Sequence, residues 1–237
     1  MLLFNLLKFD TELFGFGVAK ILAPKLDVSE LQTILKELQQ QDVHLVYWPV
    51  SQDKLSQQVA QQFKGMLCSN QITYLLNLQT LTVPAIAPEV VIYQEPTATV
   101  ELEQLAMQAG MYSRFKVDPK FPHELFVKLY RAWIANSVNG TIAKRVMVIR
   151  YNNKVVGMIT LGTKNSRGDI GLLAVSSEFR NQHFGTKLVH AAQAYFLQNG
   201  YKSAQVVTQQ ANVLACHLYE KCGFRREKTE LFYHFWL

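Results

Sequence analysis

A polar loop centred on Arg180 could hold a phosphate group. It follows an apolar run, Leu173–Val175, that is typical of a strand end, and it leads into a helix that we expect to open at Gly185. The first turn of a helix exposes unpaired backbone N–H groups and the positive end of the helix dipole, so this junction favours an anion. Arg180 adds positive charge, and Gly185 has no side chain to block a phosphate.

A second polar pair lies further along the chain. Asn212 precedes a run that is typical of a helix, and Tyr219 lies seven residues later on the same helical face. Taken alone, such an asparagine usually caps its helix and such a tyrosine usually belongs to a core. An amide and a phenol on one face could also contact a ligand together.

The order of these features resembles the core of the GCN5-related N-acetyltransferase (GNAT) superfamily. Its signature runs from an apolar strand end through an aromatic–arginine pair, a glycine-containing loop and a helix to a distal block ending in Gly-Phe. The matching residues are Leu173, Val175, Phe179, Arg180, Gly185, Asn212, Ala215, Tyr219, Gly223 and Phe224. Two residues depart from the pattern, because Ser177 stands where proline is common and His183 stands where the first loop glycine is usual.

This resemblance implies acetyl-CoA as co-substrate and no bound metal. It places the pyrophosphate on backbone amides of Arg180–Gly185, and the acetyl carbonyl beside a backbone N–H near Leu173 or Ala174. The strand that contains these two residues is expected to splay from Ala204–Thr208 and so admit the pantetheine arm. The cofactor-binding residues that the resemblance implies are Leu173, Ala174, Val175, Arg180, Asn181, Gln182, His183, Phe184, Gly185, Thr186, Asn212 and Tyr219.

The same resemblance makes Tyr219 and Asn212 the catalytic residues. A phenol has an ordinary pKa of about 10 and a thiol one of about 8.5, so Tyr219 could give its proton to a departing thiolate. Asn212 is expected to hold the pantetheine or the sulfur region through its amide.

Two features of this site allow alternatives. His183 could donate a hydrogen bond to the phosphate, but we favour a tolerated replacement at a position whose backbone angles need no glycine. No general base stands out, since the candidates His217, His234, Glu178 and Glu220 fit structural or solvated roles better. A site without a strong base suits an amine of lower pKa than lysine, unless an ordered water relays the proton.

The acceptor is indicated by a second resemblance. The segments Phe9–Val18, Met111–Pro122 and Trp133–Gly140 are similar to those of nucleotide-sugar N-acetyltransferases of the TDP-fucosamine acetyltransferase type, which acetylate a 4-amino-4,6-dideoxy sugar. We expect a loop here that contacts the substrate, with candidate residues Tyr112, Arg114 and Lys116. Arginine can fork onto a phosphate, and tyrosine can stack on a base or sugar. From composition alone, a solvated basic loop would be the simpler interpretation.

Composition limits the class of protein. Of 237 residues, 49% are hydrophobic and 18% are charged, which favours a folded chain with a sizeable core. The net charge of +6 fits an anionic ligand, but no dense Lys/Arg cluster indicates nucleic acid. Three cysteines without metal-ligand spacing suggest a reducing compartment, and we expect neither a signal peptide nor a membrane span, hence a cytoplasmic protein.

The order of the expected elements is that of the GNAT fold. The resemblance therefore implies the α/β (α+β) arrangement of that fold, a mixed, mostly antiparallel sheet flanked by helices. Prolines near Thr82–Pro96 suggest a linker between a small N-terminal α/β domain, 1–82, and an acetyltransferase domain, 97–237. The expected helices are Ser29–Gln40, Lys54–Phe63, Val100–Gln108, His123–Ser137, Thr186–Gln198 and Val213–Cys222. The expected strands are Val43–Val50, Ile72–Leu78, Val146–Tyr151, Val155–Leu161, Asp169–Val175, Ala204–Thr208 and Leu231–Leu237.

Together these observations predict transfer of acetyl from acetyl-CoA to a primary amine, most simply that of a nucleotide-linked amino sugar. The same site could instead acetylate a protein N-terminus, a polyamine or another small amine. A non-catalytic CoA-binding module is a third hypothesis, which the unusual His183 could support. The apolar last strand, Leu231–Leu237, is expected to lie centrally in the sheet, although it could form part of a homodimer contact.

Overall fold

The computed structural model describes residues 3–82 and 85–237, and its contacts divide the chain into two units. Unit 1 consists of Met1–Gln71, Tyr112–Phe126 and Thr229–Leu237, and unit 2 consists of Ile72–Met111 and Val127–Lys228. This division differs from two contiguous segments, 1–82 and 97–237, because the chain returns to unit 1 twice after first leaving it.

The expected linker near Thr82–Pro96 contains a strand. Val90–Ile92 pairs with Met147–Ile149 in antiparallel register and forms an edge of the sheet. Pro84 lies outside the described residues. The expectation of irregular structure was therefore wrong at 90–92, where pairing with a distant strand overrides the proline-rich surroundings.

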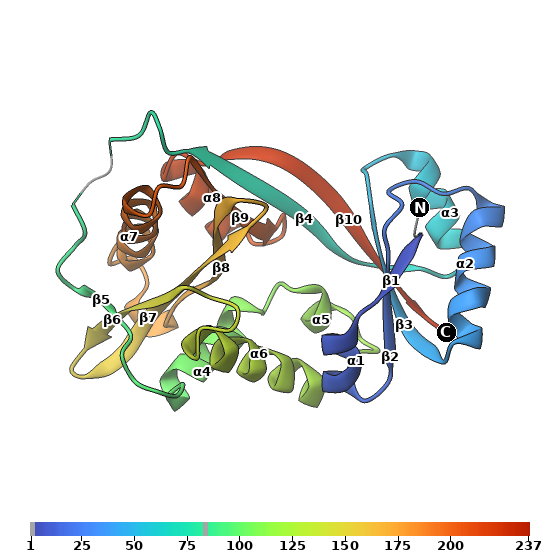
Figure 1. Ribbon diagram of the computed structural model, residues 1–237, viewed down its shortest axis with the longest axis horizontal. Helices are drawn as coiled ribbons and strands as arrows, with labels where there is room; N and C mark the ends of the chain where they lie inside the picture. Colours follow the sequence, from blue (N-terminus) through green and yellow to red (C-terminus); the bar gives the residue numbers. More distant parts are fainter. Residues whose placement is uncertain (1–2, 83–84) are drawn as a thin grey trace. The chain divides into compact units, whose positions relative to one another are not determined.

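Unit 1 has helices on both faces of its strands (Figure 1). Its hydrogen-bonded strand order is β1-β2-β3-β10-β4, in which β2 and β3 run parallel. The elements are β1 (Phe4–Leu6), α1 (Lys8–Phe14), β2 (Gly17–Ile21), α2 (Val28–Gln40), β3 (Val43–Val50), α3 (Lys54–Gln62), β4 (Met66–Asn77), α5 (Arg114–Val117) and β10 (Arg225–Trp236). The strands β4 and β10 continue into unit 2.

The two long helices of unit 1 begin where the sequence supplies caps. The Asp27 side chain accepts from the Glu30 backbone N–H, and the Glu30 side chain accepts in return from the Asp27 backbone N–H, which closes a capping box before α2. The Asp53 side chain caps α3 by accepting from one backbone N–H, without the return bond. Leu31, at the core face of α2, is fully buried. The predicted helices and the Val43–Val50 strand are thus confirmed here, while β1, α1 and β2 were not predicted.

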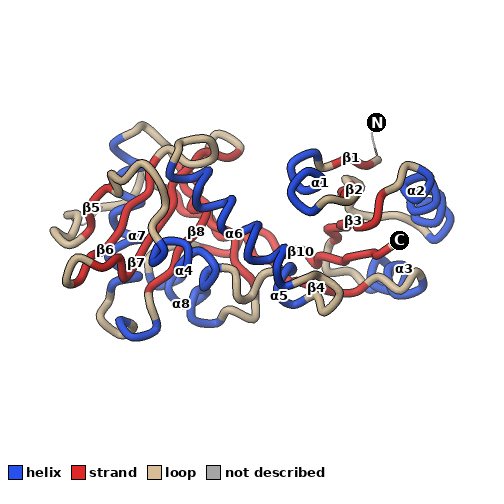
Figure 2. Tube along the Cα trace, turned by 90° about the horizontal axis from the view of Figure 1, so that it is seen from below, coloured by secondary structure: helices blue, strands red, loops and turns tan. Residues whose placement is uncertain are grey.

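Unit 2 is built on the strand order β4-β9-β8-β7-β6-β5, antiparallel from β8 to β5 with a parallel β8–β9 pair. Figure 1 shows α7 and α8 on one face of these strands and α4 and α6 on the other, and Figure 2 gives a second view. The elements are β5 (Val90–Ile92), α4 (Val100–Ala109), α6 (His123–Val138), β6 (Arg145–Tyr151), β7 (Lys154–Lys164), β8 (Arg167–Val175), α7 (Phe184–Gln198), β9 (Ser203–Gln209) and α8 (Val213–Lys221). The mixed, mostly antiparallel sheet flanked by helices confirms the expected fold class.

The core of unit 2 fixes α7 and α8 relative to each other. Leu188 and Phe196 of α7 are fully buried, and the buried Gln193 amide donates a 2.7 Å hydrogen bond to the Cys222 carbonyl at the end of α8. The asparagine pair 152–153 has positive φ at both positions and forms the tight hairpin turn between β6 and β7. Among the described residues, no helix combines the length and apolar character needed to cross a membrane.

Candidate functional site

A bulge in β8 separates this strand from β9. Opposite β7 the register passes from Ile159↔Leu173 to Leu161↔Ile170, so β8 carries one extra residue. The Thr160 hydroxyl accepts a 2.8 Å hydrogen bond from the Leu172 N–H and so satisfies a buried donor that the bulge removes from the ladder. A Cβ at Gly171 would lie 2.8 Å from that hydroxyl, which explains the glycine at the bulge.

Beyond the bulge, β8 presents a free edge. Its pairing with β9 ends at Ile170↔Val206 in the described chain, which confirms the expected splay. The Ser176 N–H donates to the Val156 carbonyl at 2.8 Å, and the alternation of an antiparallel ladder then turns the backbone groups of Leu173 away from β7. The Ala174 N–H faces β7 by the same alternation. Of the two expected donors, Leu173 is the one with a free N–H.

The start of α7 is also free to bind a ligand. The helix begins at Phe184 rather than near Gly185–Thr186, and no side chain caps it, unlike α2, α3, α4 and α8. Its first internal hydrogen bond runs from the Lys187 N–H to the His183 carbonyl at 3.0 Å. The three preceding amides therefore point off the helix end, next to exposed Arg180, as an anion site requires.

His183 adopts the left-handed conformation, with φ 60° and ψ 12°, and Asn181 also has positive φ. The expectation that this position needs no glycine was therefore wrong. A left-handed conformation costs a residue with a Cβ about 1 kcal/mol. This cost is smaller for asparagine than for histidine. The fold therefore demands here the conformation that glycine adopts most easily.

Replacing His183 with glycine is expected to raise the free energy of unfolding by up to about 1 kcal/mol, because the strain disappears. Chemical denaturation measures the gain, and calorimetry with CoA measures binding in the same samples. Asn181→Gly is the control, with a smaller gain expected. A large loss of CoA affinity in His183→Gly would show instead that the imidazole contributes a hydrogen bond to the ligand.

Gly185 is constrained by helix packing. A Cβ on this residue would lie 3.1 Å from Leu218 Cδ2 of α8, closer than most such contacts. The absence of a side chain thus lets α7 and α8 approach at the start of α7, in addition to leaving the helix end open.

Asn212 and Tyr219 both belong to α8. Asn212 caps the helix, with its Oδ1 accepting from the Ala215 N–H at 3.3 Å, which leaves its Nδ2 as a donor. Tyr219 is 4% exposed, and its ring centroid lies 6.1 Å from that of Tyr74 and 5.9 Å from that of Phe224. Asn212 is thus a helix cap and Tyr219 a core residue, as the conventional interpretations have it. The Asn212 amide nitrogen and the Tyr219 hydroxyl remain available to a ligand.

The Tyr219 hydroxyl differs from that of its neighbour Tyr74. In the part of the chain that the structure describes, it has no hydrogen-bond partner, and it is not one of the fully enclosed unpaired polar atoms. The Tyr74 hydroxyl, in contrast, donates to Glu220 at 2.8 Å, and Glu220 also pairs with Arg226. Burial raises the pKa of Tyr219 above its ordinary value, so the phenol stays protonated near neutral pH.

The three predicted substrate residues belong to unit 1, whereas the cofactor residues belong to unit 2. The expected loop was wrong at 114–117, where the chain forms the short helix α5. Tyr112 and Lys116 are exposed. The Arg114 guanidinium lies over the rings of Tyr47 at 4.4 Å and of Phe115 at 4.2 Å, in a cation–π arrangement.

The surroundings of Arg114 are acidic and aromatic. The Tyr47 hydroxyl donates to Asp10 Oδ2 at 3.1 Å, and burial raises the pKa of Asp10 against the opposing charge of Arg114. The Arg114 Nε is enclosed without a partner among the described residues. Asp10 and Tyr47 were not identified from the sequence, since each resembles an ordinary helix or strand residue until the fold joins them.

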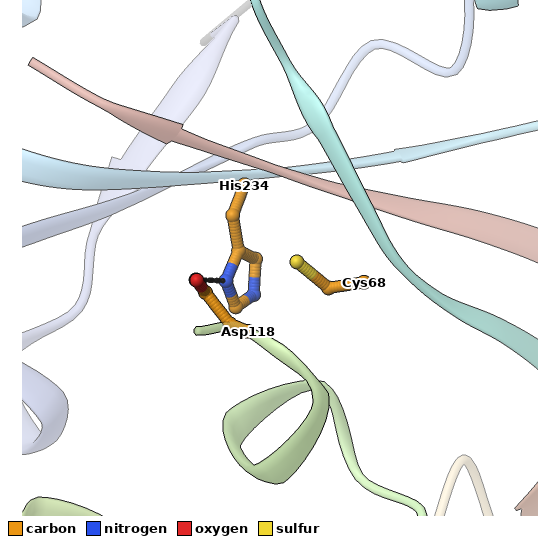
Figure 3. Close-up of side chains that lie close together, drawn as sticks. All are labelled: Cys68, Asp118 and His234. Carbon is orange, nitrogen blue, oxygen red and sulfur yellow. Dashed lines mark hydrogen bonds and ion pairs between the residues drawn. The ribbon is translucent and has the colours of Figure 1, made fainter. Parts of the chain in front are cut away.

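A further group in unit 1 was missed by sequence reasoning. Cys68, Asp118 and His234 meet in the interior, with one potential ligand atom from each within 4.8 Å of the others (Figure 3). They come from β4, the segment after α5, and β10, so no spacing along the chain could reveal them. Two of the candidate bases are thus engaged elsewhere: His234 bonds to Asp118, and Glu220 pairs with Arg226.

Replacing Thr160 with valine is expected to lower the free energy of unfolding by about 1–3 kcal/mol, because the Leu172 N–H is left unpaired. If the bulge also aims the Leu173 N–H, turnover should fall more than this stability loss explains. Denaturation and steady-state kinetics measure the two effects. Thr208→Val, at another buried strand threonine, is the control. Unchanged stability in Thr160→Val would contradict the conclusion that this hydroxyl stabilises the bulge by accepting from the Leu172 N–H.

Comparison with known proteins finds a sequence match to an acetyltransferase family. The model of the acetyltransferase (GNAT) family matches residues 102–224, more than half of the chain. The spore coat polysaccharide biosynthesis protein SpsD of Bacillus subtilis (strain 168) is 26% identical over 142 residues, 60% of this chain and 49% of that protein. The chain thus matches about half the length of this curated relative.

Two solved structures share the fold. A GCN5-related N-acetyltransferase from Sphaerobacter thermophilus has a TM-score of 0.62 at 10% identity, covering 98% of this chain and 76% of that one. A tandem GNAT protein from the clavulanic acid biosynthesis pathway has a TM-score of 0.58 at 14% identity, covering 92% and 75%. At these identities the likeness concerns the fold alone.

Proposed function

The chain belongs to the acetyltransferase (GNAT) family, and on this premise we propose that it transfers acetyl from acetyl-CoA to a primary amine. The observation that carries the proposal is the free edge of β8 after its bulge, in the same unit as the uncapped start of α7 and the unpaired Tyr219 hydroxyl. A strand edge can pair with the amides of an extended pantetheine arm, and a helix start can hold a pyrophosphate.

Each residue then has a defined task. The first amides of α7 and Arg180 bind the phosphates, and Asn212 Nδ2 donates to the pantetheine or the sulfur region. The Leu173 N–H donates to the carbonyl oxygen, where negative charge develops as the amine attacks. Tyr219 gives its proton to the sulfur as the carbon–sulfur bond breaks, and the amine proton passes to water.

The acceptor that we propose is the amino group of a nucleotide-linked 4-amino-4,6-dideoxy sugar. The polysaccharide biosynthesis protein among the relatives supports a sugar substrate. An amine of pKa about 8 is roughly one-tenth neutral at pH 7, whereas a lysine amine is almost fully protonated, so a site without a strong base favours the weaker amine. Arg114, held on aromatic rings in unit 1, is the proposed contact for the nucleotide phosphates, with Tyr112 and Lys116 beside it in sequence.

The test is a substrate panel with the full-length protein. Release of CoA is measured with nucleotide-linked amino sugars, with peptides bearing free N-termini and with polyamines, each at equal concentration. We expect turnover with the amino sugars. Turnover only with peptides or polyamines would reject the sugar while keeping the acetyltransferase. Calorimetric binding of CoA without turnover of any amine would favour a non-catalytic CoA-binding module.

A further inference from the structure

The Cys68, Asp118 and His234 side chains form an enclosed polar group inside unit 1. Cys68 is 3% exposed, Asp118 2% and His234 1%. They come from three separate segments of the chain, and Figure 3 shows the imidazole lying between the carboxylate and the sulfur. Polar atoms this deep are usually all paired, so an atom without a partner needs an explanation.

Asp118 is fully engaged by its neighbours. Its Oδ2 accepts from His234 Nδ1 at 2.7 Å and from Trp236 Nε1 at 2.9 Å, and its Oδ1 accepts from the Lys120 N–H at 2.9 Å. The carboxylate therefore orients the imidazole with its proton on Nδ1. An imidazole with its proton on Nδ1 has a lone pair on Nε2.

The His234 Nε2 is the unpaired atom. It is enclosed and has no hydrogen-bond partner in the described part of the chain. Figure 3 shows the Cys68 sulfur on the side of the ring away from Asp118. An imidazole whose other nitrogen is bonded to a carboxylate is the arrangement by which proteins orient a metal-ligating histidine.

We propose that Cys68 Sγ and His234 Nε2 bind one soft monovalent metal ion, Cu(I), in a two-coordinate site. Thiolate and imidazole are ligands that suit copper. On binding, the thiol proton leaves to solvent, a sulfur–copper bond and a nitrogen–copper bond form, and no electron is transferred. Asp118 acts through the histidine and is a positioning residue rather than a ligand.

The charge balance favours a monovalent ion. Exchange of one proton for one Cu(I) leaves the net charge of the buried group unchanged, whereas a divalent ion adds one positive charge, and the Asp118 carboxylate that could offset it already accepts three hydrogen bonds. The nearby Arg114 guanidinium, whose charge acts on both Cys68 and His234, further opposes a second positive charge. Structural zinc also takes four ligands. Among the described residues only His234 Nε2 and Cys68 Sγ, whose thiol donates a 3.4 Å hydrogen bond to the Met66 carbonyl, are left for a metal here.

A reactive thiol is a weaker interpretation of the same residues. The buried Cys68 thiol donates a 3.4 Å hydrogen bond to the Met66 carbonyl, which favours the protonated thiol over the nucleophilic thiolate. The thiol is also too enclosed for a substrate to reach. A metal ion, in contrast, displaces the thiol proton directly.

The test uses the full-length protein without oxygen. Cu(I) is titrated against a chromogenic chelator, and X-ray absorption records the ligands of the retained ion. We expect one ion per chain, bound to one sulfur and one nitrogen. Cys68→Ser should lose at least 100-fold in affinity, whereas Cys216→Ser and Cys222→Ser, at equally buried cysteines of unit 2, should bind as the parent does.

Three results would overturn the site: no retained copper, a shell with two sulfurs, or equal affinity in Cys68→Ser. Circular dichroism of the metal-free variants checks that they fold. If Cys68→Ser fails to fold, the X-ray absorption of the parent protein still decides, because a shell without one sulfur and one nitrogen rejects the proposal. None of these measurements depends on acetyl transfer, so the site and the proposed function are tested separately.

Discussion

Replacing Tyr219 with phenylalanine is expected to lower kcat for acetyl transfer by about 100-fold or more, the usual contribution of general acid catalysis. The ring contacts with Tyr74 and Phe224 persist in the variant, and the lost hydroxyl has no hydrogen-bond partner among the described residues. Stability and the KM for acetyl-CoA should therefore change little. Steady-state kinetics and thermal unfolding of the same preparation measure the two expectations.

Tyr74→Phe is the matched control for this experiment. Its hydroxyl donates to Glu220 and lies 3.2 Å from Arg226 Nε, so its removal should reduce stability while kcat stays close to that of the parent. An equal loss of kcat in both variants would indicate a general disturbance of α8. An unchanged kcat in Tyr219→Phe would reject this residue as the general acid.

Replacing Asp118 with alanine is expected to lower the free energy of unfolding by several kcal/mol, because each buried donor left unpaired costs about 1–3 kcal/mol. Three donors then lose their acceptor, those of His234, Trp236 and Lys120. Denaturation in urea measures the change. Glu12→Ala, which removes only the exposed Lys8–Glu12 pair at 3.8 Å, should change stability by less than about 1 kcal/mol.

The same pair predicts how stability depends on pH. Burial alone would raise the pKa of Asp118, but hydrogen bonds from His234 and Trp236 outweigh it and lower the pKa. Burial lowers the pKa of His234. Both groups thus bind protons more weakly in the folded state, so acid favours unfolding. The His234 contribution is lost as the pH falls below 6.5, and that of Asp118 as the pH falls below 3.8 toward its folded pKa.

Denaturation curves measured across this pH range check the sign. The parent protein should lose stability continuously on acidification. In Asp118→Ala, the part of this loss that the carboxylate causes below pH 3.8 should be absent. A parent protein that gains stability between pH 6.5 and 5 would show that His234 is protonated in the folded state.

Local sequence predicted most elements that position the proposed acetyl-CoA-binding residues. The strands at 167–175 and 203–209 and the helices at 184–198 and 213–221 differ from their predicted bounds by two residues or fewer at their ends. The reason is that periodicity and helix caps act within a few residues of the chain. Short elements such as β1, β2, β5 and α5 escaped because their patterns are too brief to separate from turns.

The backbone details of the site depended on pairing partners. Whether Leu173 or Ala174 offers a free N–H is decided by the register of β8 against β7, and a shift of one residue would exchange them. The positive φ of His183 follows from the short loop that joins β8 to α7. The residue type histidine does not predict it. Neither property belongs to a residue type.

The amino-acid sequence by itself determined the family, the apolar strand end, the loop with Arg180 and the helix that holds Asn212 and Tyr219. The tertiary structure alone decided that Arg114 stacks on aromatic rings and that Cys68, Asp118 and His234 meet. Neighbouring residues interact through local propensity, which can be deduced from order and spacing. Residues more than a hundred positions apart meet only when the pairing of distant strands brings them together.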